Sequence, residues 1–226
     1  MAYVEGRVVH DADSHVVETP EWLVPYADPD VRARMKPLFL KTVKPGEETF
    51  IDDLRRRHAD PAERPAAEAE IMLRKNWSAL GSFVKDDRPR ALDLLGFRTQ
   101  LVFNTFLNNY LCDVEHEADV AFAYGLARAH NRAMVDFCSV DRRLIATGYV
   151  PLADFDRARA MAEEALAAGC RALLVPSRCP GDGRRATPGC SRSGRSRKRP
   201  ACRSSSTSAA ADICSTSTTS RTGCRS

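Results

Sequence analysis

The stretch that decides the fold is LIATGYVPLADFDRARAMAEEALAAGCRALLVP, residues 144–176. Two short apolar runs, Leu144–Pro151 and Arg171–Pro176, enclose an alanine-rich stretch, Asp154–Ala168, which Gly169 ends. The apolar runs are typical of buried strands, and the stretch between them has the spacing of a helix. A strand, a helix and a second strand in this order predict two parallel strands joined by a right-handed crossover.

The same alternation extends toward the N-terminus. The pattern first predicts a strand over Arg7–Asp13 and then a helix that starts with Thr19 as N-cap and Pro20 at its first position. Loops and short helices are expected over Asp28–Arg64. They are followed by a helix over Arg88–Leu95 ended by Gly96, a strand over Thr99–Phe103 and a long helix over Glu115–Val140. Strands that alternate with helices are characteristic of a parallel sheet. Residues 1–176 therefore predict an α/β fold with four βα steps.

The composition changes abruptly after Pro176. Ser177–Ser226 holds eleven of the 34 basic residues but only two of the 30 acidic ones, so its formal charge is +9 and that of residues 1–176 is −5. Ile213 is the only large apolar residue of this tail, which cannot bury enough apolar surface to offset the entropy lost on ordering. We therefore expect a folded part at residues 1–176 and a disordered tail at residues 177–226.

Cysteine usage and hydropathy indicate the compartment. Cys112, Cys138 and Cys170 stand in apolar segments and are expected to be buried free thiols. The tail carries five more cysteines, without CxxC spacing or an accompanying histidine, which argues against a zinc site there: Cys179, Cys190, Cys202, Cys214 and Cys224. No signal peptide opens the sequence and no run approaches the roughly 20 apolar residues of a membrane span. We expect a cytoplasmic protein without a membrane partner.

One short motif carries the candidate chemistry. It is Asp11-Ala12-Asp13-Ser14-His15, at the C-terminal end of the first expected strand. Side chains two residues apart on a strand project to the same face, so Asp11, Asp13 and His15 are expected to point the same way. A carboxylate and an imidazole that converge can ligate a divalent ion such as Zn²⁺, although Asp13 could instead cap a turn and His15 be an ordinary polar residue.

The sequence around this motif resembles a known family. Val9–Glu18, followed by Pro20 and Trp22, looks like the opening of the amidohydrolase-related family that includes aminocarboxymuconate semialdehyde decarboxylase. Further stretches are similar to the same family, namely Ala91–Phe97, Asn131-Arg132 with Asp136-Phe137-Cys138, Arg143–Leu152 and Gly169–Pro176. The resemblance covers about three quarters of the chain.

The resemblance implies the first half of a (β/α)8 barrel of the TIM type, with Asp13 and His15 as two ligands of a divalent metal ion, expected to be Zn²⁺. The family's first ligand is often His, and the Asp found here also occurs among its decarboxylating relatives. Later strands would supply another His and an Asp. The implied activity is that of a metal-dependent hydrolase or a non-oxidative carboxy-lyase on a small carboxylated or cyclic substrate, with a homo-oligomer left open for the intact enzyme.

Other polar and aromatic residues favour ordinary roles. His10 is expected to face away from Asp13, as packing or surface. Three further histidines are expected to be solvated: His58, His116 and His130. Trp22 and Trp77 favour packing over lining a substrate pocket. Asn108-Asn109-Tyr110 follows the second strand and could reach such a pocket, because loops at strand ends build barrel sites.

The tail suggests translation in a shifted reading frame. If the codons from Ala186 onward are read displaced by two bases, with third bases chosen freely, Thr187–Gly194 can encode His-Pro-Gly-Leu-Phe-Pro-Val-Trp. The stretch around Cys202–Asp212 can encode Leu-Pro-Val-Val-Val-His-Val-Gly-Gly-Gly-Gly, similar to the family's fifth strand. We therefore hypothesise that residues from about Gly181 are out of frame, and that the chain is an inactive, truncated product that does not fold stably.

Two other interpretations stay open. The basic Ser191–Arg203 segment could be a nucleic-acid-binding tail on a small non-catalytic α/β domain, although it lacks interleaved aromatic residues. The net charge of +4 describes neither part of the chain and does not favour nucleic acid as a partner. Alternatively, residues 1–176 form a non-catalytic half-barrel that pairs with another chain.

Overall fold

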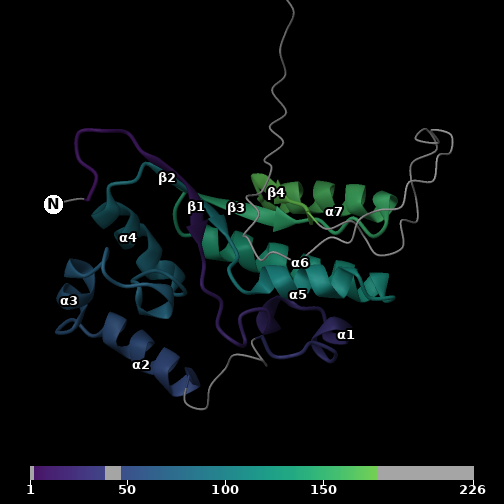
Figure 1. Cartoon of the computed structure of the whole chain (residues 1–226), viewed down its shortest axis with the longest axis horizontal. Coiled ribbons are helices and arrows are strands. Elements are labelled where there is room, and N and C mark those ends of the chain that lie inside the picture. Colours follow the sequence, from purple (N-terminus) through teal and green to yellow (C-terminus); the bar gives the residue numbers. More distant parts are fainter. Residues whose placement is uncertain (1–2, 39–46, 178–226) are drawn as a thin grey trace, which may run out of the picture. The chain divides into compact units, whose positions relative to one another are not determined.

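Four parallel strands form one sheet, in which each strand lies beside the strand that precedes it in the sequence (Figure 1). The computed structural model describes residues 3–38 and 47–177, all within one compact unit, Met1–Arg184. The strands are β1 His10–His15, β2 Thr99–Phe103, β3 Leu144–Tyr149 and β4 Ala172–Leu174. The predicted mixed α/β fold, with a parallel sheet alternating with helices, is confirmed.

Helical segments connect the strands. Between β1 and β2 lie the 3-10 helix Val24–Tyr26, α1 Pro29–Arg32, α2 Glu47–Ala59, α3 Arg64–Ala69, the 3-10 helices Asn76–Ser78 and Lys85–Asp87, and α4 Arg88–Leu95. Two helices, α5 Leu107–Glu115 and α6 Val120–Cys138, join β2 to β3, and α7 Phe155–Ala168 joins β3 to β4. The long connection after β1 and the helices that follow β2 frame the end of the sheet where the strands terminate.

Local chemistry explains the end of α4 and the start of α7. Gly96 ends α4 in the left-handed conformation, with φ of 77°, as its position after Leu95 predicts. The Asp154 carboxylate accepts hydrogen bonds from the backbone N–H groups of Asp156 and Arg157 and so caps α7. These contacts place both helices where the sequence predicts them.

One expected helix is present with narrower bounds, and another is absent. Within Glu115–Val140 the structure has one helix, α6, which begins only at Val120 because the Asp119 carboxylate caps it by accepting from the Phe122 N–H at 2.9 Å. The helix expected to begin at Thr19 is a series of turns followed by the short 3-10 helix, so that expectation is wrong. The segment after it contains α2, a helix of 13 residues where the sequence predicts only short ones.

Helices cover one face of the sheet. Alternate strand residues, among them Val102, Leu144 and Ala146, are buried against α4 and α6 in a cluster that also holds Val16, Leu92, Met134 and Phe137. The residues between them, Leu101 and Ile145, are only partly buried. The second face of the sheet is therefore apolar but incompletely covered by the described residues.

The cysteines that the structure describes follow the expectation closely. Cys138 and Cys170 are buried free thiols, and burial raises their pKa values to about 12 and about 11, while Cys112 is half-buried. The cysteines, charge and proposed frame change of residues 178–226 lie outside the described residues. In the described part of the chain, no helix is long and apolar enough to cross a membrane.

Candidate functional site

An irregularity in β1 shapes the site. Asp11 pairs with Gln100 and Ser14 with Val102, so three residues of β1 run opposite two of β2. Because Gln100 and Val102 share a face of β2, the extra residue moves Asp11 to the side of Ser14. The expectation that Asp11 shares a face with Asp13 and His15 is therefore wrong, because simple alternation does not continue through this bulge.

Asp13, within the bulge, and His15, just after it, lie together. His15 Nε2 is 3.2 Å from Asp13 Oδ1, and the two side chains are 43% and 91% exposed. On the other side of the ring, Nδ1 lies 2.9 Å from the backbone carbonyl oxygen of Asn104. A carbonyl oxygen only accepts, so Nδ1 carries a proton, and Nε2 is the ring nitrogen that faces the Asp13 carboxylate.

A buried hydrogen-bond network supports the other side of β1. Arg88, at the start of α4, donates from Nε to Gln100 Oε1 at 3.0 Å, from Nη1 to the Gly81 carbonyl at 2.9 Å and from Nη2 to Ser14 Oγ. Gln100 in turn donates from Nε2 to Asp11 Oδ2 at 3.2 Å. Burial lowers the pKa of Arg88 to about 10, which leaves the guanidinium charged at neutral pH.

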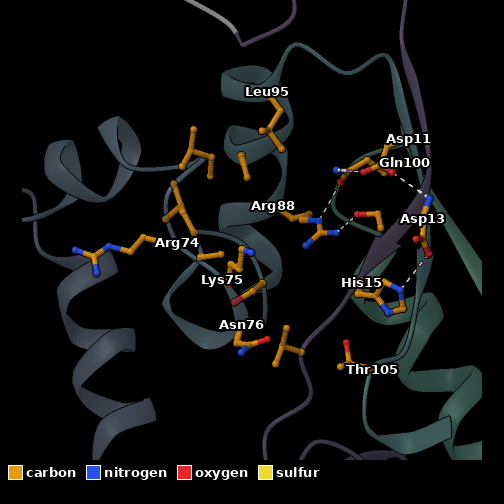
Figure 2. Close-up of a pocket in the computed structure, with 17 residues that line it drawn as sticks. Asp11, Asp13, His15, Arg74, Lys75, Asn76, Arg88, Leu95, Gln100 and Thr105 are labelled. Carbon is orange, nitrogen blue, oxygen red and sulfur yellow. Dashed lines mark hydrogen bonds and ion pairs between the residues drawn. The ribbon is translucent and has the colours of Figure 1, made fainter. Parts of the chain in front are cut away.

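These residues line one groove of about 830 Å³ (Figure 2). Figure 2 shows Asp13 and His15 pointing toward each other from β1, Asp11 beside Gln100, and Arg88 reaching toward β1 from α4. Arg74, Lys75 and Asn76 line the groove from the segment after α3. The groove thus places the Asp13–His15 pair in the same hollow as three basic side chains, those of Arg74, Lys75 and Arg88.

The pair fits part of a metal site. Zinc bonds of about 2.0–2.2 Å in tetrahedral geometry separate neighbouring ligand atoms by about 3.4 Å, close to the 3.2 Å between His15 Nε2 and Asp13 Oδ1. A neutral imidazole with its other nitrogen bonded to a carbonyl is the usual form of a ligating histidine. Within residues 3–38 and 47–177, however, no group of three or more His, Cys, Asp or Glu is arranged to hold a metal ion. The described residues offer two ligands.

Two buried polar residues, Asn104 and Glu18, lie near the Asp13–His15 pair. Neither side-chain polar atom of Asn104 has a hydrogen-bond partner within the described ranges, although the residue is buried. Glu18 is fully buried and accepts from the backbone N–H groups of Thr105, Phe106 and Leu107 at the start of α5. Burial raises the pKa of the Glu18 carboxyl, against the opposing effect of these donors.

The remaining sequence-based expectations have mixed outcomes. His10 is exposed, with Nδ1 2.7 Å from Thr99 Oγ1, as expected. His58 and His130 are buried, so the expectation of solvated rings is wrong: each lies on the apolar side of its helix. Trp22 and Trp77 pack against core clusters, as the sequence predicts. The segment Asn108-Asn109-Tyr110 belongs to α5 and does not line the groove.

Sequence reasoning missed Arg88, Gln100 and Asn104 as parts of the site. Gln100 carries a signal, because it is a polar residue inside the apolar run of β2, and such residues are bonded when buried. Arg88 stands at the polar start of a helix and has no comparable signal. No protein-family model matches the chain, and no curated protein matches it either.

Proposed function

We propose that this chain carries the first half of a metal-dependent amidohydrolase-type barrel, whose activity is hydrolysis or non-oxidative decarboxylation of a small carboxylated or cyclic substrate. The observation that carries the proposal is the arrangement of His15, whose Nε2 atom lies 3.2 Å from the Asp13 carboxylate while Nδ1 is bonded to the Asn104 carbonyl. The pair lies where β1 ends, and the C-terminal ends of parallel strands are where α/β barrels bind substrates.

The topology of the sheet supports a barrel over a doubly wound fold. In a doubly wound sheet the strand order reverses at a switch point, whereas successive strands of a barrel are neighbours throughout. The order β1-β2-β3-β4 has no reversal. The partly buried apolar face that carries Leu101 and Ile145 is also what the interior of a barrel presents. We propose that further strands close this face in the intact enzyme.

Each residue of the site has a role in the proposed chemistry. Asp13 and His15 would hold a divalent ion, with Zn²⁺ as the preferred candidate because its ligands are N and O donors at this spacing. When bound, such an ion supplies electrophilic activation of water or of a substrate carboxylate. Asn104 fixes the imidazole tautomer through its backbone carbonyl. Lys75 lines the groove as an exposed cation and would attract a carboxylated substrate.

Zinc titration of the full chain tests the proposal. The tail cysteines of residues 179–224 are first changed to serine, because thiolates would otherwise bind zinc themselves. We expect His15→Ala and Asp13→Ala each to weaken zinc binding by about 10-fold or more. His10→Ala is the matched control, since His10 is an exposed histidine on the same strand. Equal affinities for His15→Ala and His10→Ala would exclude the site.

The composition of the tail bears on activity. We propose that residues from about Gly181 are translated out of frame, so that the ligands expected on later strands are not encoded in this chain. The chain would then have low stability, and its folded form would bind metal through Asp13 and His15 without turning over substrate. Resequencing the gene tests this directly, because an unshifted gene whose alternative frame has no barrel-like continuation contradicts it.

A further inference from the structure

A continuous set of hydrogen bonds connects Arg88 with both ends of the β1 bulge. One branch runs from Arg88 Nη2 to Ser14 Oγ, immediately before His15. The other runs from Arg88 Nε through Gln100 to Asp11 Oδ2. Asp11 Oδ1 then accepts from the Asp13 N–H at 3.0 Å. The two branches therefore end on the residues that flank Asp13 and on the backbone of Asp13 itself.

The donors of Arg88 are used in hydrogen bonds within the protein, so Arg88 supports β1 and does not contact a bound ligand. The residue is only 6% exposed, and its Nε, Nη1 and Nη2 atoms each donate to a different partner. All three partners are uncharged, namely the Gln100 side chain, the Gly81 carbonyl and the Ser14 hydroxyl. A lysine offers a single charged nitrogen and cannot reproduce a planar fork that reaches three directions.

The bulge is the feature that this network stabilises. In a regular strand, Asp11, Asp13 and His15 would share one face. Here Asp11 turns toward Gln100, and the extra residue sets the course of the chain between Asp11 and Ser14. The backbone path through the bulge sets the distance between the Asp13 carboxylate and the His15 imidazole, because both side chains extend from this part of β1.

We propose that Arg88 is the positioning residue of the Asp13–His15 pair, acting through Ser14 on one branch and through Gln100 and Asp11 on the other. As far as metal binding is concerned, this inference rests on the proposed function. The bracing of the pair does not, since it concerns the geometry of His15 in the metal-free chain. The two ideas can therefore fail separately.

The experiment compares variants of the full chain, all with the tail cysteines changed to serine as in the zinc titration. Arg88→Met removes the network, Arg88→Lys keeps the charge, and Gln100→Met cuts one branch at similar volume. Arg90→Met is the matched control, because Arg90 is an exposed arginine of the same helix that pairs with Glu68 instead. Three properties are measured for each: the ¹⁵N NMR shifts of the His15 ring, assigned with His15→Gln, the affinity for Co²⁺, and the midpoint of thermal unfolding.

We expect a His15 ring protonated at Nδ1 in the unsubstituted chain and in Arg90→Met. In Arg88→Met and Gln100→Met, the ring shifts should move toward a mixture of tautomers and Co²⁺ affinity should fall about 10- to 100-fold, the usual effect of removing an outer-shell partner. Arg88→Lys should restore part of both. A variant that is only less stable should have a lower unfolding midpoint but unchanged ring shifts and Co²⁺ affinity.

The outcomes separate the two ideas. Folded Arg88→Met and Gln100→Met chains with unaltered ring shifts and affinity would overturn the positioning role and leave the metal site intact. Altered ring shifts in a chain that never binds Co²⁺ would support the positioning role and overturn the proposed function. If Arg88→Met does not fold, Gln100→Met decides. Failure of both to fold would assign the network to stability and overturn the inference.

Discussion

The side chain of Asn131 in α6 is bonded to both backbone groups of Tyr149, the last residue of β3. The Tyr149 N–H donates to Asn131 Oδ1 at 2.6 Å, and Asn131 Nδ2 donates to the Tyr149 carbonyl at 3.1 Å. The Asn131 amide thus makes the two backbone hydrogen bonds that a neighbouring strand would otherwise make with Tyr149, and it connects α6 to the sheet. Asn131 and the main chain of Tyr149 are buried together.

Replacing Asn131 should therefore destabilise the fold strongly. Asn131→Ala leaves a buried N–H and a buried carbonyl without partners, which costs about 2–4 kcal/mol of unfolding free energy. Chemical denaturation measures this. Arg132→Ala is the control, because it removes an exposed ion pair with Asp28 and an exposed hydrogen bond to the Tyr26 carbonyl and should cost less than about 1 kcal/mol. Equal effects of the two substitutions would refute the role assigned to the amide.

Stability should depend on pH through His130. The ring is fully buried, and desolvation lowers its pKa from 6.5 to about 4. As the pH falls below 6.5, the unfolded chain takes up the proton first, so the contribution of the neutral ring is complete above 6.5 and is lost toward pH 4. The loss amounts to about 1 kcal/mol per pH unit. Denaturation curves of the unsubstituted chain and His130→Met should differ by this slope, and parallel pH profiles would contradict the assignment.

Much of the fold could be predicted from the sequence, because its signals are local. Gly96 ends α4 and Asp154 starts α7 through contacts within a few residues, and both ends lie where the sequence places them. The exact start of α6 could not be predicted from periodicity, since the residues on both sides of the Asp119 cap keep apolar helical spacing.

The candidate site was predictable only in part. The proximity of Asp13 and His15 follows from their spacing on one strand. The bulge does not, because it depends on Gln100 and Arg88, which lie more than seventy residues further along the chain. The burial of His130 depends likewise on tertiary contacts, with Trp22 and Tyr149 packed edge-on against its ring.

A glycine should be required where the chain meets the start of α4. Gly81 has a φ of +74°, and a Cβ atom there would lie 2.9 Å from the Arg88 Cα atom. Gly81→Ala should therefore combine backbone strain with a clash against main chain that cannot yield. Gly6→Ala is the control for strain alone, because Gly6 has a similar φ of +69° and open space around it. We expect Gly81→Ala to cost at least about 2 kcal/mol more than Gly6→Ala in denaturation experiments.

Restoring the reading frame should stabilise the protein. In the restored gene the reading frame is displaced by two bases before Ala186, so that the codons of Thr187–Gly194 are read as His-Pro-Gly-Leu-Phe-Pro-Val-Trp. The new segment would supply apolar residues to cover the incompletely covered face of the sheet. We expect a higher midpoint of thermal unfolding and tighter zinc binding than in the present chain. A restored product that melts no higher, or that binds zinc no more tightly, would count against both the barrel and the frame change.

The X-ray absorption spectrum of the zinc-loaded full chain, with its tail cysteines changed to serine, tests the central claim most directly. The account predicts a first shell of nitrogen and oxygen at about 2.0–2.1 Å, with outer-shell scattering from an imidazole. That imidazole signal should disappear in His15→Ala and persist in His10→Ala. A shell of sulfur at about 2.3 Å, or an imidazole signal that survives the loss of His15, would contradict it.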